Sequence, residues 1–182
     1  MHDLKTVNKS EGEINAPIGP VRSRMTLART PRLSLVANVN ASFVIINPVL
    51  AALAVWWSIT AFGIHASDLI FWVIAHLIGF VGVSISLHRY FSHASFKCGK
   101  TLRAILAVLG MSTAQGSLLF WVASHRHHHA RSDRNGDPHS PIAGRRSILQ
   151  GIWNAHFGWM LSHTFSNPAH FARDLMKDPM II

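Results

Sequence analysis

The sequence predicts an all-α membrane protein with one transmembrane helical hairpin, followed by cytoplasmic or interfacial helices that carry clusters of histidine. The chain has 182 residues, of which 49% are hydrophobic. No charged residue occurs from Leu33 to Ser67 or from Leu69 to Leu87, and each run is long enough to cross a hydrocarbon core as a helix. Two short segments beyond these runs hold six of the 13 histidines.

The length suits a single domain preceded by a tail. Residues 1–38 are mostly polar and are expected to form a cytoplasmic N-terminal tail, because they lack the apolar stretch of a secretory signal. Residues 39–182 are expected to form the domain. The only cysteine, Cys98, cannot form an intramolecular disulfide, so nothing indicates an oxidising compartment.

The two membrane spans are expected at about Phe43–Gly63 and Leu69–Leu87, joined by a short turn around His65–Asp68. Six Lys and Arg residues precede the first span, none lies in the turn, and the other eleven follow the second span. This distribution places the N-terminus and the histidine clusters of a multi-pass protein in the cytoplasm. The formal charge of +9 is therefore expected to face anionic lipid or an acidic protein partner, and no nucleic-acid-binding motif is present.

A third uncharged run, Ala104–Ser124, is not expected to cross the membrane. Its middle is polar, with Ser112, Thr113 and Gln115, and basic residues flank it on both sides. We expect one or two helices at the cytoplasmic membrane face instead. The later apolar segment Ile148–Leu161 is expected to form an amphipathic helix against the same face.

The segment Ser124–His129 has the spacing of a metal-binding face. Residues i, i+3 and i+4 of a helix share one side, so His125, His128 and His129 can direct their imidazoles to one point while His127 points away. Neutral imidazole is the commonest metal ligand among protein side chains. This pattern predicts a metal site.

His88 and His93 extend the metal prediction upstream, but their spacing is less simple. Five residues of ideal α-helix turn about 500°, which leaves the two side chains on different faces. Both can be ligands only if the helix ends or bends between them, or if they serve different ions. Downstream, Asp133 and Asp137 are candidates to orient ligating histidines by hydrogen bonds, with solvated loop carboxylates as the alternative.

At these residues the sequence resembles the membrane-bound fatty acyl desaturases of the delta-9 type. His88–His93 is similar to their first histidine box, HxxxxH, and His125–His129 to their second, HxxHH. The later segments Gly136–Pro141 and His156–Leu161 are similar to stretches that follow the second box in bacterial and plant members. The resemblance runs from about Val39 to Pro179 and covers the N-terminal portion of such an enzyme.

The resemblance implies an oxidoreductase of lipid metabolism that uses O2 to insert a cis double bond into a saturated fatty acyl chain. It implies a non-haem site of two iron ions, with electrons from a ferredoxin or a cytochrome b5. The histidines at the family's ligand positions are His88, His93, His125, His128 and His129. No separate catalytic residue is implied, and the substrate-binding residues are not specified.

Two departures from the family pattern shape the expectation for this chain. Animal acyl-CoA members carry Arg-Asp before the second box, where Ala123-Ser124 stands here. Among the three possible carriers of the acyl chain, this difference counts against CoA and leaves a carrier protein or a lipid open. The family's third box, another HxxHH, and its second pair of spans do not follow His129. We therefore expect a partial desaturase domain that is inactive alone. The alternatives are a fatty acid hydroxylase or alkane monooxygenase of the same histidine-box class, or a noncatalytic membrane metal-binding remnant.

Overall fold

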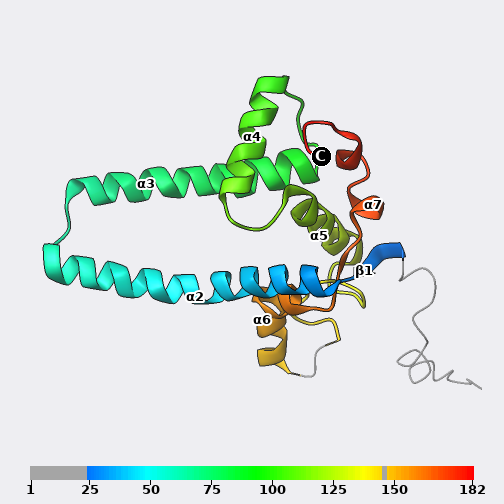
Figure 1. Cartoon of the computed structure of the whole chain (residues 1–182), viewed down its shortest axis with the longest axis horizontal. Helices are drawn as coiled ribbons and strands as arrows, with labels where there is room; N and C mark the ends of the chain where they lie inside the picture. The colour runs from blue at the N-terminus through cyan, green and yellow to red at the C-terminus, as the bar shows by residue number, and fades with distance from the viewer. Residues whose placement is uncertain (1–23, 145–146) are drawn as a thin grey trace, which may run out of the picture.

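A computed structural model describes residues 24–144 and 147–182 of the chain (Figure 1). Most of the expected polar tail, residues 1–23, lies outside the described residues. The elements follow in the order β1 (Thr26–Ala28), α2 (Pro31–Phe62), α3 (Ala66–Phe80), η1 (Val81–Ser92), α4 (Lys100–Ser112), α5 (Leu118–Arg131), α6 (Ile148–His156), η2 (Gly158–Leu161), β2 (Thr164–Ser166), α7 (Pro168–Phe171) and η3 (Leu175–Lys177).

Helix α2 begins earlier than the sequence analysis placed the first span. Thr30 caps it by accepting a hydrogen bond from the amide of Leu33, and Pro31 occupies the first turn, where a missing N–H costs nothing. The helix ends at Gly63, whose φ of +77° suits glycine. Part of the segment expected to be a polar tail is therefore helical.

The second apolar helix is also longer than predicted, because α3 continues without interruption into η1. The amide of His65 donates to the carboxylate of Asp68 at 2.9 Å, so Asp68 lies in the first turn of α3 and not in the connection. Within the described residues, two helices are long and apolar enough to cross a membrane, Pro31–Phe62 and Ala66–Ser92. They run in opposite directions from the connection at residues 63–65 (Figure 1).

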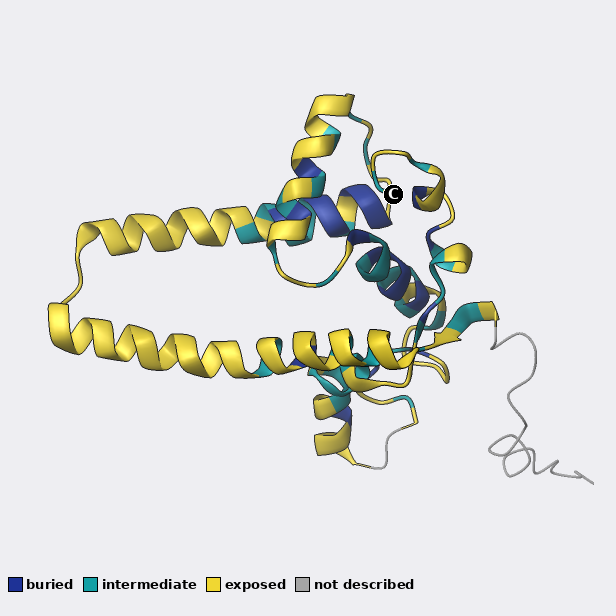
Figure 2. Ribbon diagram, viewed as in Figure 1, coloured by how far each residue is buried: buried dark blue, intermediate teal, exposed yellow. Residues whose placement is uncertain are grey.

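Figure 2 shows that the residues of both long helices near their connection are exposed, without a buried stripe. Large apolar residues such as Trp56, Leu69 and Phe71 are more than half exposed. An apolar surface of this size is unfavourable in water and favourable in lipid. The exposure pattern therefore supports association with a membrane.

The buried residues gather where η1, α4 and α5 meet (Figure 2). Small residues allow η1 to approach α4 closely: a Cβ on Gly82 would lie 2.5 Å from the carbonyl oxygen of Leu109. The hydroxyl of Ser86 donates to the carbonyl of Leu106 at 2.5 Å. Backbone-to-backbone contact of this kind is typical of helices packed through small residues.

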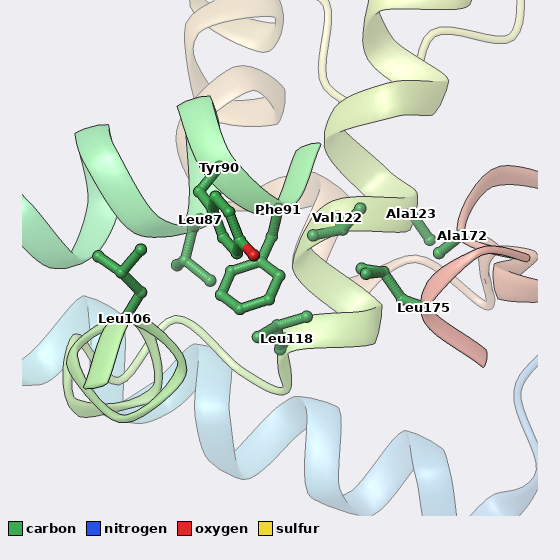
Figure 3. Packing of buried hydrophobic residues seen from close by; sticks show 9 residues of the cluster. All are labelled: Leu87, Tyr90, Phe91, Leu106, Leu118, Val122, Ala123, Ala172 and Leu175. Atoms are coloured by element: carbon green, nitrogen blue, oxygen red, sulfur yellow. The ribbon is translucent and has the colours of Figure 1, made fainter. Parts of the chain in front are cut away.

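A compact apolar cluster connects these helices to the C-terminal segment, as Figure 3 shows. Phe91 of η1 and Val122 of α5 are almost completely buried. The cluster consists of Leu87, Tyr90, Phe91, Leu106, Leu118, Val122, Ala123, Ala172 and Leu175. It fixes the ends of the two helices that carry the histidine boxes.

The third uncharged run, Ala104–Ser124, is divided between α4 and α5 as two helices, and no single helix spans it. Ser117 ends the connecting loop and caps α5 by accepting from the amide of Phe120. The prediction of one or two helices in place of a membrane span is therefore confirmed, and their location at the cytoplasmic membrane face stays a prediction. The later segment Ile148–Leu161 is helical only to His156, after which the short 3₁₀ turn η2 begins.

The all-α prediction needs one correction. Strands β1 and β2 form an antiparallel pair in which Leu27 lies opposite Phe165. Three-residue strands have almost no periodicity in the sequence, and this pair exists because the chain before α2 meets the chain after η2. The pair closes the described fold beside α5.

Candidate metal centre

The first histidine pair is brought together by an unusual helix. Residues Val81–Ser92 form a π-helix, whose hydrogen bonds join residue i to residue i+5. The amide of His93 donates to the carbonyl of His88 at 3.1 Å. The two imidazoles therefore lie side by side on the helix and meet edge to face, with ring centres 4.7 Å apart.

The second pair comes from α5, where His125 and His129 are four residues apart. Their ring centres are separated by 4.5 Å, as expected for neighbours one turn apart on an α-helix. His125 also lies close to both histidines of η1, with ring centres 4.7 Å from His88 and 5.2 Å from His93. Two helices thus contribute two imidazoles each to one point.

The geometry of this four-histidine point fits a metal ion. One ligand nitrogen from each of His88, His93, His125 and His129 lies within 4.8 Å of all the others. The Nε2 atoms of His93 and His125 are 3.1 Å apart. Two nitrogens bound to one ion at about 2.1 Å are separated by about 3.0 to 3.4 Å, so this spacing suits two ligands of a single metal.

Two of the four imidazoles, those of His93 and His125, have lowered pKa values. Burial lowers the pKa of His125 to about 3, assisted by the neighbouring histidines. Desolvation and the proximity of His88 lower the pKa of His93 in the same direction. Both rings are therefore neutral at physiological pH, which is the form that binds metal.

Trp121 fixes the orientation of the His125 ring. Its indole stacks on the imidazole with ring centres 4.8 Å apart and planes inclined by 19°. The indole nitrogen donates to the side chain of Gln115 at 2.7 Å. The loop before α5 therefore holds Trp121, which in turn limits the movement of one ligand.

His128 lies in a different environment from the other four predicted ligands. Its Nδ1 is 2.9 and 3.0 Å from the two carboxylate oxygens of Asp137, and its ring stacks on His139 at 4.2 Å. His128, Asp137 and His139 form the second group of potential metal ligands in the described chain. Of the five predicted ligands, four are brought together and His128 faces this second group.

Asp137 is held so that it can orient His128. Burial alone would raise the pKa of its carboxyl, but hydrogen bonds from His128 and from the amides of Asp133 and His139 together lower it. The carboxylate is thus ionised at neutral pH and accepts the hydrogen bond of Nδ1 of His128, which leaves Nε2 as the ring nitrogen that faces a potential metal. Asp133 instead accepts from Ser140 at 2.9 Å.

His127 points away from the four-histidine point, towards the opposite side of α5. Its Nδ1 lies 3.0 Å from the hydroxyl of Ser166 in β2, and its ring stacks on Phe171. Burial lowers the pKa of His127 to about 4, so the ring is neutral. His127 therefore anchors α5 to the C-terminal segment.

A cavity of about 720 Å³ lies along the face of α5 that includes His127. Arg29 and Arg131 contribute positive charge to its wall, and Phe120 and Trp159 contribute apolar surface. Arg29 donates to the carbonyl of Met160 at 2.5 Å, and Arg131 contacts the sulfur of Met25 at 3.7 Å. Neither of these two contacts, both within the described part of the chain, is with a carboxylate.

Sequence reasoning did not single out His139 or Trp121. His139 stands alone in the sequence, and only its position two residues after Asp137 hints at a role in the same group. Trp121 lies four residues before His125, a helical spacing that places aromatic and imidazole rings together. That spacing is a usable signal.

Comparison with curated proteins identifies relatives of the chain. It is 39% identical over 141 residues, or 75% of its length, to a hex-5-enoyl-[acyl-carrier protein] acetylenase of Moorena producens (strain JHB). It is 32% identical over 117 residues, 62% of its length, to the sn-1 stearoyl-lipid 9-desaturase of Anabaena variabilis. The chain is related to the fatty acyl desaturases. A plant desaturase, delta-9 acyl-lipid desaturase 1 of Arabidopsis thaliana, is 29% identical over 153 residues, 84% of the chain.

The chain spans less than half the length of these desaturase relatives, namely 43%, 38% and 45% of them in the order given. No family model matches the chain, and no solved structure matches it. The relatives confirm the resemblance read from the two histidine boxes. They also make the chain's relationship to oxidoreductases of lipid metabolism clear.

Proposed function

We propose that this chain carries part of the metal centre of a fatty acyl desaturase that uses O2 to insert a cis double bond into a saturated acyl chain. The observation that carries the proposal is the convergence of His88, His93, His125 and His129 from two helices on one point. The names of the relatives support an acyl substrate, since they describe desaturation of lipid-linked chains and action on a chain linked to carrier protein.

Iron is the metal that this proposal assigns to the site. A set of neutral imidazoles suits iron among other divalent ions, and nitrogen ligands withstand oxidation better than thiolates. Iron, when bound, supplies the O2-dependent oxidation of an unactivated C–H bond, which no side chain can perform. The four histidines hold the metal, and Trp121 restricts the orientation of His125.

We assign His128 to a second iron, beside the ion held at the four-histidine point. Asp137 fixes the proton on Nδ1 of His128, so the ring offers Nε2 to a metal. Five histidines are too few for two irons, which would need ligands beyond this set. We therefore expect little or no desaturase activity from the 182-residue chain alone.

The cavity beside α5 is a candidate for the polar end of the substrate carrier. Arg29 and Arg131 give its wall two positive charges against the one carboxylate of Asp137, and a phosphate group is the chemistry that guanidinium pairs recognise best. CoA, the prosthetic group of a carrier protein and phospholipids all contain phosphate. The acyl chain itself requires an apolar environment, which the helices next to the cavity provide.

The orientation in the membrane follows from the charges. The connection between α2 and α3 contains no Lys or Arg. Lys and Arg residues lie before the first apolar run and after the second. We therefore place the hairpin across the membrane with the N-terminus and both histidine boxes in the cytoplasm. The basic cytoplasmic surface suits an acidic electron donor such as a ferredoxin or a cytochrome b5.

A chimera tests the proposed function. The chain to Pro179 is joined to the remaining portion of the Anabaena variabilis relative, and the fatty acids of host cells are analysed by gas chromatography and mass spectrometry. The proposal expects an unsaturated product that is lost when His125 is replaced by Ala. A hydroxylated product would instead indicate a hydroxylase, and an inactive chimera that still binds iron would favour a noncatalytic metal-binding protein.

The same assay applied to the 182-residue chain tests the proposal that it is inactive alone. Purified protein in lipid vesicles is supplied with iron, O2, a reduced electron donor and an acyl substrate. Little or no unsaturated product is expected. Desaturation at the rate of the chimera would contradict the requirement for further ligands.

A further inference from the structure

Arg126 lies inside the second histidine box and makes an extended set of contacts with its guanidinium. It donates to the backbone carbonyls of Phe91 and Ser92 at 2.9 and 2.8 Å and to that of Phe171 at 2.9 Å. It also forms two hydrogen bonds with the carboxylate of Asp174, at 2.6 and 3.0 Å. Nε and both terminal nitrogens of the guanidinium are engaged.

The two carbonyls at Phe91 and Ser92 are at the end of the π-helix η1. The carbonyls before them, at His88, Arg89 and Tyr90, accept hydrogen bonds from the following loop. The last carbonyls of any helix have no partner within the helix. A planar guanidinium can satisfy two of them at once, and its charge also complements the negative end of the helix dipole.

This arrangement joins the two helices that supply the metal ligands. Ser92 directly precedes His93, and Arg126 directly follows His125. The Nε2 atoms of these two histidines are 3.1 Å apart. A displacement of the end of η1 relative to α5 would move His93 away from His125, so the hydrogen bonds of Arg126 control the distance between the ligands.

Asp174 has a second role in this arrangement. A partly buried guanidinium next to a cationic metal would oppose metal binding. The carboxylate of Asp174 compensates for that charge and holds the guanidinium in its plane. The C-terminal segment that follows α7 is thereby coupled to the metal site.

We propose that Arg126 is a positioning residue for the metal centre, which fixes the end of η1 against α5 so that His93 and His125 face one ion, and that Asp174 keeps it in place. This inference rests on the proposed function, because it requires the four-histidine point to bind a metal. It gives a role to Arg126, which lies between the ligands His125 and His128 of the second histidine box.

A matched ion pair elsewhere in the fold provides the control. Arg103 of α4 binds Asp178, which follows η3, so this pair also ties the C-terminal segment to a helix. The guanidinium of Arg103 also lies over the rings of Tyr90 and Phe91 in η1, at 5.9 and 5.8 Å from their centroids, so Asp178→Asn, which leaves Arg103 itself in place, is the cleaner of the two control variants. Loss of this pair is expected to affect stability without changing the distance between the histidines.

The test is a titration of the full-length chain in detergent micelles with Co²⁺, whose visible absorption reports the geometry of its ligands. Arg126→Gln is expected to weaken Co²⁺ binding at least about tenfold and to alter the visible spectrum. Arg126→Lys should bind Co²⁺ more tightly than Arg126→Gln but less tightly than the natural chain, since lysine keeps the charge and lacks the planar guanidinium that makes several hydrogen bonds at once. Asp174→Asn should fall between them, and Arg103→Gln and Asp178→Asn should bind within about twofold of the natural chain.

The outcomes separate the inference from the proposed function. If the natural chain binds no Co²⁺, the proposed function and the inference both fail. If the natural chain binds and Arg126→Gln binds equally well with the same spectrum, only the inference is overturned. Equal losses of affinity in the Arg126 and Arg103 variants, tracking the loss of helical circular dichroism, would reduce Arg126 to a general stabilising residue and also overturn it.

Discussion

The close approach of η1 and α4 makes Gly82→Ala a sensitive test of the fold that positions His88. A Cβ at Gly82 would lie 2.5 Å from the carbonyl oxygen of Leu109 and 2.5 Å from the methyl carbon of Thr113. The backbone carbonyl cannot rotate away, so the helices must separate. Overpacking of this kind typically costs about 1 to 3 kcal/mol.

Gly79→Ala is the matched control, because a Cβ there meets nothing within 4 Å. Both substitutions gain the helix propensity of alanine, about 1 kcal/mol, so the difference between the two variants isolates the steric cost. Unfolding titrations with sodium dodecyl sulfate in mixed micelles should show Gly82→Ala less stable than Gly79→Ala by about 1 to 3 kcal/mol. Equal stabilities would refute the close packing of η1 on α4.

The same pair of variants connects packing to the metal site. His88 follows Gly82 on η1, so separation of the helices should shift His88 relative to the histidines of α5. Co²⁺ binding is therefore expected to weaken in Gly82→Ala and to remain unchanged in Gly79→Ala. An unstable Gly82→Ala variant that retained full affinity would show that α4 does not help to position the first box.

The other predictions concern the two metal groups, the acid stability and the orientation of the hairpin. Asp137→Asn should leave Co²⁺ affinity at the four-histidine point within about twofold, whereas His125→Ala should lower it at least about tenfold; equal losses would mean that both groups share one ion. The bound Arg126 lowers the pKa of Asp174 in the folded chain. The ionised carboxylate therefore contributes its full stabilisation of the fold above the ordinary carboxyl pKa, and this contribution is lost as the pH falls through the lowered pKa. Between about pH 6 and about pH 3, unfolding titrations should show a loss of stability that is larger in the natural chain than in Asp174→Asn by under about 1 kcal/mol, given the exposure of this carboxylate; an equal loss in both would contradict it. In cells, His65→Cys in a Cys98→Ala background should react with a membrane-impermeant maleimide from outside, and labelling only after permeabilisation would reverse the proposed orientation.

The long apolar helices were predictable because their signal is additive over many residues. Uncharged runs of this length have few alternatives to a membrane helix. Their boundaries were less well predicted, although Thr30 and Pro31 are a recognisable start signal. Hydropathy alone favoured a later start, since Arg32 interrupts the apolar character of the first turn.

The placement of His88 and His93 on one face could not be predicted from α-helical geometry. With α-helical geometry, both residues can be ligands only if the helix ends or bends between them, or if they bind different ions. The structure supplies a further solution, in which i to i+5 hydrogen bonds align both rings without a break. Whether a segment forms a π-helix depends on packing against α4 and α5, which a single-sequence pattern does not contain.

The short strands illustrate a related limit. Thr26 and Ser166 are opposite each other in β1 and β2, although most of the chain lies between them. Such pairing depends on the path of every intervening helix, and three residues carry too little periodicity to reveal it. Helix existence was therefore predictable, whereas the closure of the fold was not.

The position of His128 gives a physical meaning to the spacing of the second histidine box. His125 and His129 are one turn apart and serve the four-histidine point, for which HxxxH would be sufficient. His128 and His129 are adjacent, so their side chains leave the helix about 100° apart, and their rings meet edge to face at 5.6 Å. Two such rings are poorly placed to share one ion, which is why His128 faces Asp137 and His139 instead. A third histidine at i+3 fits the proposal of a second metal position, because Asp137 and His139 lie beside it as further potential ligands.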